Sequence, residues 1–294
     1  KRISLLLFNL RLFQLPLIRR LALSFVLWAG WPSSAFPESD CAGCIDLIEI
    51  IEGESEESAP DDSASSTSAP PSSASYFGVA VLDTGVQLQP PMLAPGSVSF
   101  VGGDPLIDYA QQGTHGTAVA QVILTLAPGS KILSLQTSNG GRSVSASAVY
   151  QGLLHAAANP SIRVINHSNA ALAVVPGDAL LAAAAADKVV VMGAGNDWLA
   201  NPAGDALHAP GLGGKGLIVG GLGPDEKLLE FSNRAGAYAD HYVVALGASQ
   251  FADYWGSSFA TPRASALAAR LRQTWPKLTA AEVVDIIKRS ATDK

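Results

Sequence analysis

The 294-residue chain has few charged residues and very little cysteine. Asp, Glu, Lys and Arg make up only 15% of it and apolar residues 48%, which excludes disorder along the whole length. Basic residues are not in surplus, because the formal net charge is -6, and this counts against a nucleic-acid partner. Two cysteines cannot build a disulfide-dense scaffold, so the core must come from the burial of apolar side chains.

The acidic residues are concentrated near the N-terminus. Ten of the 25 fall between Glu38 and Asp62, whereas the chain from Tyr76 onward carries 14 basic and 15 acidic residues. Residues 52–75 are mainly Ser, Pro and acidic side chains, with too little apolar content to offset the entropy lost on ordering. We therefore expect residues 36–75 to be a disordered acidic linker and residues 76–294 to be the folded domain.

Residues 1–35 have the features of an export signal. A basic stretch precedes the apolar run 21–31, and the small residues 33–35 suit a cleavage site. The run is shorter than the ~20 residues of a membrane span, which favours a signal over the alternative, a membrane anchor. We expect an extracellular or periplasmic protein with membrane contact only through residues 1–31.

Cys41 and Cys44 form a CxxC pair between the expected signal and the linker. Because the pair lies outside any βαβ unit, a redox role is disfavoured. A local disulfide and two unbonded thiols both stay open as alternatives.

From Tyr76 onward, short apolar runs alternate with helical stretches, a pattern typical of right-handed βαβ units around a parallel sheet. The expected strands are residues 77–82, 131–136, 162–166, 189–194 and 217–220. The expected helices are residues 117–126, 144–158, 178–187, 260–272 and 280–289. The fold class that follows is a three-layer α/β/α domain with a mostly parallel central sheet.

Polar residues follow several of these apolar runs, where ligands bind in open α/β sheets. Asp83 comes directly after the first strand, and Asn196 follows the strand 189–194. His115 and Ser258 each precede a helix. We therefore expect a carboxylate, an amide, an imidazole and a hydroxyl at one edge of the sheet.

These four groups are the ones that acyl transfer requires. His115 could take the proton of Ser258, Asp83 could orient the imidazole, and the Asn196 amide with the Ser258 N–H could stabilise an oxyanion. A structural reading exists for each residue: Asp83 as a helix cap, for example, or Asn196 as a turn residue.

The segments around these residues resemble the motifs of the subtilisin-like serine proteases, the subtilases. Asp83 lies in VAVLDTGV, His115 in GTHGTAVA, Asn196 in VVVMGAGND and Ser258 in GSSFATP. The four residues occur in the family order with separations of 32, 81 and 62 residues, and the resemblance covers about residues 76–290. It implies an exported serine endopeptidase that hydrolyses peptide bonds through an acyl-enzyme.

The resemblance also implies how a substrate is held. The segment VINHSNA is similar to the strand that pairs with substrate, which assigns Ser168, Asn169 and Ala170 to substrate binding. The turn before Asn196 adds Gly193, Ala194 and Gly195. A monomer acting on protein or peptide substrates is expected, without nucleic acid or a required cofactor or metal. Calcium is suggested by the family alone.

Several positions depart from the family pattern. Ala170 replaces a Gly and adds a Cβ at the substrate edge, and Phe259 replaces the usual Met after the nucleophile. Arg263 replaces a His in the following helix, and Ser257 stands next to Ser258, so an assignment displaced by one residue must be considered.

Two other functions remain open from the sequence alone. One is a catalytically inactive binding module of the same fold, because intact motifs do not prove a preorganised site. The other is a general α/β ligand-binding domain in which the motifs occur by chance.

Overall fold

The computed structural model describes residues 45–46, 76–110, 114–140, 144–249, 251 and 254–293. The expected signal at residues 1–35, the Cys41–Cys44 pair and most of the expected linker lie outside the described residues. Across the ranges given above, no helix has the length and apolar character of a membrane span.

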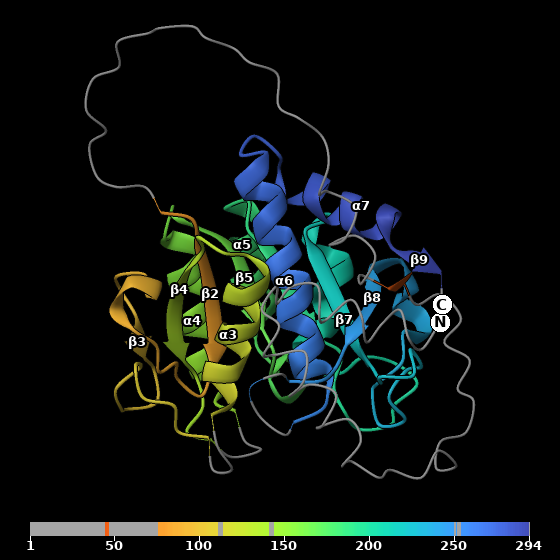
Figure 1. Cartoon of the computed structure of the whole chain (residues 1–294), viewed down its shortest axis with the longest axis horizontal. Helices are drawn as coiled ribbons and strands as arrows, with labels where there is room; N and C mark the ends of the chain where they lie inside the picture. The colour runs from red at the N-terminus through yellow and green to blue at the C-terminus, as the bar shows by residue number, and fades with distance from the viewer. Residues whose placement is uncertain are drawn as a thin grey trace, which may run out of the picture. The chain divides into compact units, whose positions relative to one another are not determined.

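A parallel sheet forms the centre of the domain, as the sequence predicted (Figure 1). Its order is β3-β4-β2-β5-β6-β7-β8-β1-β9, and only the β1–β9 pair is antiparallel. The strands are β1 (Ile45–Asp46), β2 (Gly78–Asp83), β3 (Val98–Ser99), β4 (Lys131–Gln136), β5 (Ile162–His167), β6 (Val189–Gly193), β7 (Gly216–Leu222), β8 (Tyr242–Leu246) and β9 (Thr292–Asp293).

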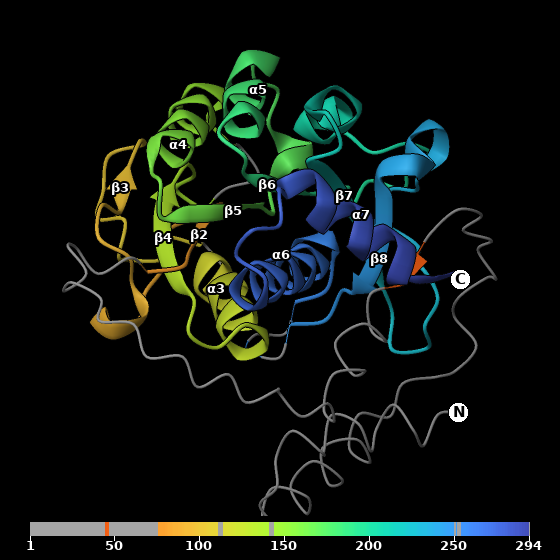
Figure 2. The same cartoon turned by 90° about the horizontal axis from the view of Figure 1, so that it is seen from above.

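Helices cover both faces of the sheet and complete the predicted three layers (Figure 2). One face carries α3 (His115–Leu126), α6 (Ser257–Thr274) and α7 (Ala280–Ser290), and the other carries α4 (Ala146–Ala158) and α5 (Gly177–Ala185). Short 3₁₀ segments are η1 (Pro90–Met92), η2 (Ala170–Leu172), η3 (Gly204–Leu212) and η4 (Gly236–His241). Strands β2, β6 and β7 are nearly continuous apolar runs, as is typical of parallel strands that are covered on both sides.

Helix α6 lies against the middle of the sheet and is buried around most of its circumference. Small residues make this possible, since Ala260, Ala264, Ala268 and Ala269 have no exposed surface. Its N-terminus therefore lies at the ends of β5, β6 and β7, and Ser258 is in its first turn.

The structure also differs from the sequence prediction in places. Strand β8 was not predicted, and α6 begins at Ser257, three residues before the predicted start. Ile45 and Asp46, within the expected disordered linker, form β1, which pairs with β8 and β9. Two paired residues do not test the linker as a whole, which stays a prediction.

Candidate active site

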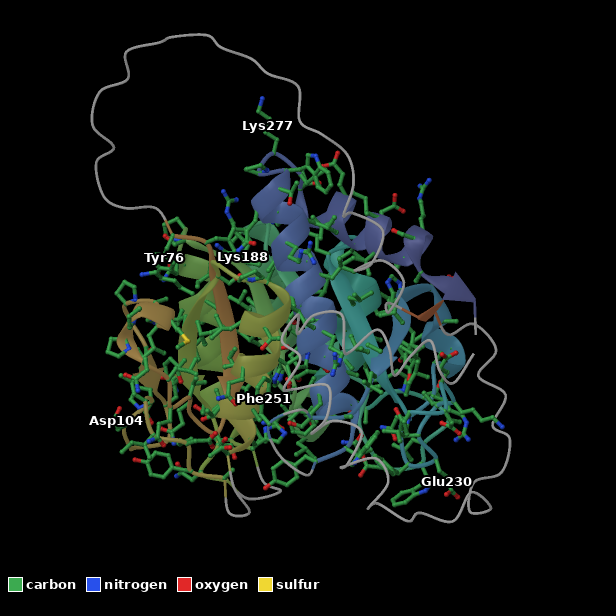
Figure 3. The ribbon with its side chains drawn as sticks, viewed as in Figure 1. Tyr76, Asp104, Lys188, Glu230, Phe251 and Lys277 are labelled. Carbon is green, nitrogen blue, oxygen red and sulfur yellow. The ribbon has the colours of Figure 1, made fainter. Side chains whose placement is uncertain are left out.

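The four candidate residues lie at the end of the sheet toward which the parallel strands point. Asp83 is the last residue of β2, Asn196 follows β6, and His115 and Ser258 occupy the first turns of α3 and α6. In Figure 3, Asp104, Phe251 and Glu230 mark this end, whereas Tyr76, Lys188 and Lys277 mark the opposite one.

Asp83 and His115 are in direct contact. The Asp83 carboxylate is completely buried, and its Oδ1 lies 2.7 Å from His115 Nδ1. The backbone N–H of Thr84 donates to the same oxygen at 2.8 Å. Asp83 Oδ2 is buried without a hydrogen-bond partner in the described part of the chain. The contact fixes the imidazole with Nδ1 toward the carboxylate and Nε2 on the far side of the ring.

The charge state of His115 depends on two opposing influences. Burial, the largest, lowers the pKa of His115. The charge and hydrogen bond of Asp83, together with the charge of Asp108, outweigh it and raise the pKa of His115 above its ordinary value. The histidine side chain is 21% exposed, so it remains within reach of a substrate. These are the properties of a base that is stabilised once it has taken a proton.

Gly116 allows α3 to begin this close to β2. A Cβ at this position would lie 2.3 Å from the Gly85 carbonyl oxygen and 3.1 Å from Asp83 Cβ. Any side chain here would therefore push the first turn of α3, and His115 with it, away from Asp83.

Two aromatic side chains, Tyr254 and Phe259, form a wall beside the imidazole, called the aromatic wall below. The ring of Phe259 lies 5.2 Å from that of His115, and Tyr254 stacks on Phe259 at 5.9 Å with an interplanar angle of 6°. The His115 and Tyr254 ring centres are 6.5 Å apart. This wall restricts the imidazole on the side toward α6, where Phe259 is the neighbour of Ser258.

A proline shapes the backbone around Ser258. Pro262 lies inside α6 and lacks the N–H that would bond the Ser258 carbonyl four residues earlier. The Ser168 hydroxyl donates to that carbonyl instead, at 2.9 Å. A buried chain of hydrogen bonds, from Ser265 to Asn166 and from Asn166 to Ser168, holds the hydroxyl in place.

Ser258 and Ser257 have clearly different environments. The Ser258 side chain is half-buried, and its Oγ donates to the Ser168 carbonyl at 3.4 Å. No hydrogen bond joins it to His115, although both residues are described. Ser257 is only 1% exposed, and its Oγ accepts the backbone N–H of Gly195 at 3.2 Å. Burial therefore disfavours Ser257 as a nucleophile.

The Asn196 side chain is oriented by the turn that precedes α6. Its Oδ1 accepts the backbone N–H of Ser257 at 2.9 Å, so the amide nitrogen is the end left to donate. Gly256 makes this approach possible, because it adopts φ +151° and a Cβ there would lie 3.0 Å from Asn196 Nδ2.

The residues expected to bind substrate lie in two neighbouring segments that both contact the start of α6. Ser168 and Ala170 are buried and Asn169 is half-buried, with Ala170 at the start of η2. Gly193, Ala194 and Gly195 are buried, and the Ala194 carbonyl accepts hydrogen bonds from Asn233 and Ala203. A Cβ at Gly193 would lie 2.8 Å from the Ser168 carbonyl oxygen, so the two segments are packed directly against each other.

Sequence reasoning missed Asp108 and Thr84. The Thr84 hydroxyl donates to Asp108 Oδ1 at 2.6 Å, and Asp108 Oδ2 accepts the Thr117 N–H at 2.7 Å. No motif marks Asp108, which lies in an irregular loop seven residues before His115. For Thr84, the sequence offered only its position directly after Asp83, which is weaker evidence for a role in the site than a motif would be.

Arg263, a departure from the family pattern, has a structural role. Its guanidinium donates to the carbonyls of Leu246 and Ala248, at 2.9 and 3.2 Å, where β8 ends. Burial lowers the pKa of Arg263 to about 10. These hydrogen bonds link α6 to the start of the segment that connects β8 with Ser257.

Metal binding finds no support among the described residues, which contain no cluster of three or more His, Cys, Asp or Glu side chains able to hold an ion. Calcium, suggested by the family alone, stays a prediction.

The model of the subtilase family matches residues 75–294. A search of the curated proteins gives no match.

Among solved structures, a cold-adapted subtilisin-like serine proteinase is 22% identical with a TM-score of 0.60, covering 83% of this chain and 91% of that one. The prenylagaramide maturation protease PagA is 22% identical with a TM-score of 0.59, covering 75% and 86%. MycP1 from Mycobacterium smegmatis is 21% identical with a TM-score of 0.54, covering 71% and 72%. At these identities the likeness concerns the fold.

Proposed function

Because this chain belongs to the subtilase family and is a serine-type peptidase, we propose that Asp83, His115 and Ser258 are its catalytic triad. The observation that carries the proposal is the 2.7 Å contact between the buried Asp83 carboxylate and His115, beside the helix turn that holds Ser258. Proteins and peptides are the substrates of this family, and the reaction proposed is hydrolysis of peptide bonds inside a chain.

The first step forms an acyl-enzyme. The bond from Ser258 Oγ to the Ser168 carbonyl is long, at 3.4 Å, so the hydroxyl can turn toward His115 at little cost. As Oγ attacks the substrate carbonyl carbon, His115 Nε2 accepts its proton. Asp83 stabilises the resulting imidazolium through Nδ1 and keeps it oriented.

The negative oxygen of the tetrahedral intermediate would be stabilised by two donors. Ser258 is the second residue of α6, where backbone N–H groups have no partner within the helix and the helix dipole favours negative charge. Asn196 supplies the second donor, since its oxygen is held by Ser257 N–H and its nitrogen is left for the oxyanion.

The remaining steps return the enzyme to its starting state. His115 gives its proton to the leaving amine, and the peptide bond breaks. Water then attacks the acyl carbon while His115 accepts its proton, and His115 returns that proton to Ser258 Oγ as the ester bond breaks and the carboxylic acid product leaves. Each step uses residues of this chain and no metal.

We further propose that substrate backbone runs past Ser168–Ala170 and Gly193–Gly195, two segments that pack against each other at the ends of β5 and β6. The Ser168 hydroxyl already donates to the Ser258 carbonyl. Ser168 would therefore hydrogen-bond a peptide through its main chain and not through its side chain. Export is proposed from the features of residues 1–35 alone.

Labelling with phenylmethylsulfonyl fluoride tests the triad. A sulfonyl adduct mapped by peptide mass spectrometry to Ser258, with loss of activity on an unstructured protein substrate, is the expected result. Ser258→Ala should take up no label, and the matched Ser257→Ala should still react. A folded wild-type protein that neither reacts nor cleaves would support the inactive binding module instead.

A further inference from the structure

Asp108, which is not part of the proposed triad, contacts both the residue after Asp83 and the start of α3. Its Oδ1 accepts the Thr84 hydroxyl at 2.6 Å and the Ala110 N–H at 3.1 Å, and its Oδ2 accepts the Thr117 N–H at 2.7 Å. One half-buried carboxylate thus connects the residue after Asp83 to the first turn of α3.

The first turn of α3 has no conventional cap. Thr114, at the N-cap position, makes no side-chain hydrogen bond to the helix. The N–H groups of Gly116 and Thr117 are satisfied from outside the helix, by Thr84 Oγ1 at 3.1 Å and by Asp108. Because His115 is the first residue of α3, whatever holds this turn also holds the imidazole.

We propose that Asp108 is a positioning residue for His115: its carboxylate fixes the first turn of α3 against Thr84 and places a second negative charge beside the imidazole. The proposal rests on the proposed function, in which His115 is the base. Thr84 serves as the link, since its hydroxyl donates to Asp108 and accepts from Gly116.

The charged surroundings of His115 support this role. Asp83 comes from β2, Asp108 from the loop before α3, and Tyr254 from the segment before α6. Helix α3 itself carries no ionisable side chain apart from His115. The charges that raise the pKa of His115 are Asp83 first and Asp108 second. Removing Asp108 should therefore lower that pKa without breaking the Asp83 contact.

The test compares Asp108→Asn with Asp104→Asn. Asp104 is a matched control, because it lies in the same loop, is exposed, and bonds only locally, to the Leu106 N–H at 2.9 Å. In Asp108→Asn, the low-pH limb of the kcat/KM profile should move to lower pH, because His115 loses its proton more readily. We expect kcat to fall about tenfold, less than the loss from a misplaced catalytic group, with KM little changed. Asp104→Asn should match wild type.

A direct titration separates this proposal from the proposed function. The imidazole of His115 can be followed by proton NMR in the Ser258→Ala background, with assignment by His115→Gln. A lower pKa of His115 in Asp108→Asn and an unchanged one in Asp104→Asn are expected even if the protein had no activity. If the NMR pKa falls but the kinetic profile does not move, His115 is not the base and the proposed function fails.

An unchanged pKa of His115 in Asp108→Asn would overturn the inference. If that variant does not fold, Asp108→Ser, which keeps a short oxygen acceptor, is measured in its place. Failure of both to fold would also overturn it, because Asp108 would then be a determinant of folding and not a positioning residue.

Discussion

Two clusters of ionisable residues lie at opposite ends of the same sheet. They differ in whether a polar atom that a substrate could reach is left without a hydrogen bond. At the carboxyl ends of the strands, Asp83 and Asp108 surround His115, whose side chain is 21% exposed and whose Nε2 has no hydrogen bond in the described part of the chain. At the amino ends, Asp187, Lys188 and Arg272 join the start of β6 to α6 and α7.

In the amino-end cluster, every side-chain nitrogen and oxygen of Asp187, Lys188 and Arg272 has a hydrogen-bond partner in the described part of the chain except Arg272 Nε, which is buried. Lys188, only 3% exposed, donates from Nζ to the carbonyls of Asn159 and Ile162 at 2.7 Å each. Arg272 bonds both the carbonyl and the carboxylate of Asp187, and the second oxygen of that carboxylate accepts the Ala280 N–H. Burial raises the pKa of Asp187, but these donors outweigh it and lower the pKa overall.

The comparison teaches that a perturbed pKa does not by itself mark an active site. Both clusters contain shifted groups. What distinguishes the carboxyl end is a titratable group with an unused, reachable nitrogen beside a half-buried hydroxyl. Substitutions at the carboxyl ends of the strands should lower turnover and leave stability intact. Substitutions at the amino ends should lower stability and leave turnover unchanged.

The largest expected effect is that of Ser258→Ala on turnover. Loss of the proposed nucleophile should lower kcat by roughly 10⁴- to 10⁶-fold. The melting temperature should stay near wild type, because the hydroxyl makes only one long hydrogen bond. Steady-state kinetics with thermal unfolding measure both, and normal turnover would remove Ser258 from the triad.

Asn196→Leu should have the next largest effect. Loss of an oxyanion donor should reduce kcat by roughly 10²- to 10³-fold while KM changes little, because the amide contacts the developing charge. Should KM rise while kcat holds, Asn196 would be a substrate-binding or turn residue.

Lys188→Met tests the opposite end of the sheet. It leaves one buried and one partly buried carbonyl without their donor, so the free energy of unfolding should fall by about 1–3 kcal/mol, with kcat unchanged. Lys215→Met is the matched control. Its Nζ also bonds a carbonyl, that of Ala184, but the side chain is 25% exposed, so the loss should be smaller.

Lys188 also predicts a pH dependence of stability. Burial, aided by nearby Arg163 and Arg272, lowers the pKa of Lys188 to about 8, whereas an unfolded lysine titrates near ~10.4. Between these values the unfolded chain holds a proton that the folded chain has released, so stability rises with pH across that window. Denaturant unfolding at several pH values should show the rise in wild type but not in Lys188→Met, and equal slopes would contradict the assignment.

Phe259→Met should have the smallest effect. It restores the residue usual in the family but removes the aromatic partner of His115 and Tyr254. Aromatic contacts of this kind contribute ~0.5–1.5 kcal/mol, so a two- to tenfold fall in kcat is expected, with KM nearly constant. Unaltered or higher kcat would mean that the aromatic wall does not restrain the imidazole.

Much of the fold followed from apolar runs. Strands β2, β4, β5 and β6 were located to within a residue or two, because each has a short group of β-branched or other aliphatic residues between helical stretches, and in β2 and β6 the apolar run is almost continuous. Strand β8 was missed because it follows β7 without an intervening α-helix, so the alternation used to find strands is absent there. The start of α6 was placed three residues late. Its first turn includes Ser257 and Ser258, and the Ser168 hydroxyl supplies the hydrogen bond to the Ser258 carbonyl that Pro262 cannot make.

The candidate site was predictable only in part. Asp83 and His115 could be predicted because each lies in a short motif, so the residues next to it in the sequence are enough to identify it. Asp108 could not, because its importance depends on tertiary contacts with Thr84 and Thr117. The aromatic wall could not be predicted either. In the sequence Phe259 is one apolar residue in place of another, and its contact with His115 depends on the tertiary fold.

Trapping the acyl-enzyme tests the central assignment most directly. Wild-type protein is mixed with p-nitrophenyl acetate, quenched in acid within milliseconds and mapped by peptide mass spectrometry. We expect a burst of nitrophenol of about one equivalent per enzyme and an acetyl group on Ser258 alone. Turnover with the acetyl group on another residue, or with no covalent intermediate at all, would contradict the account.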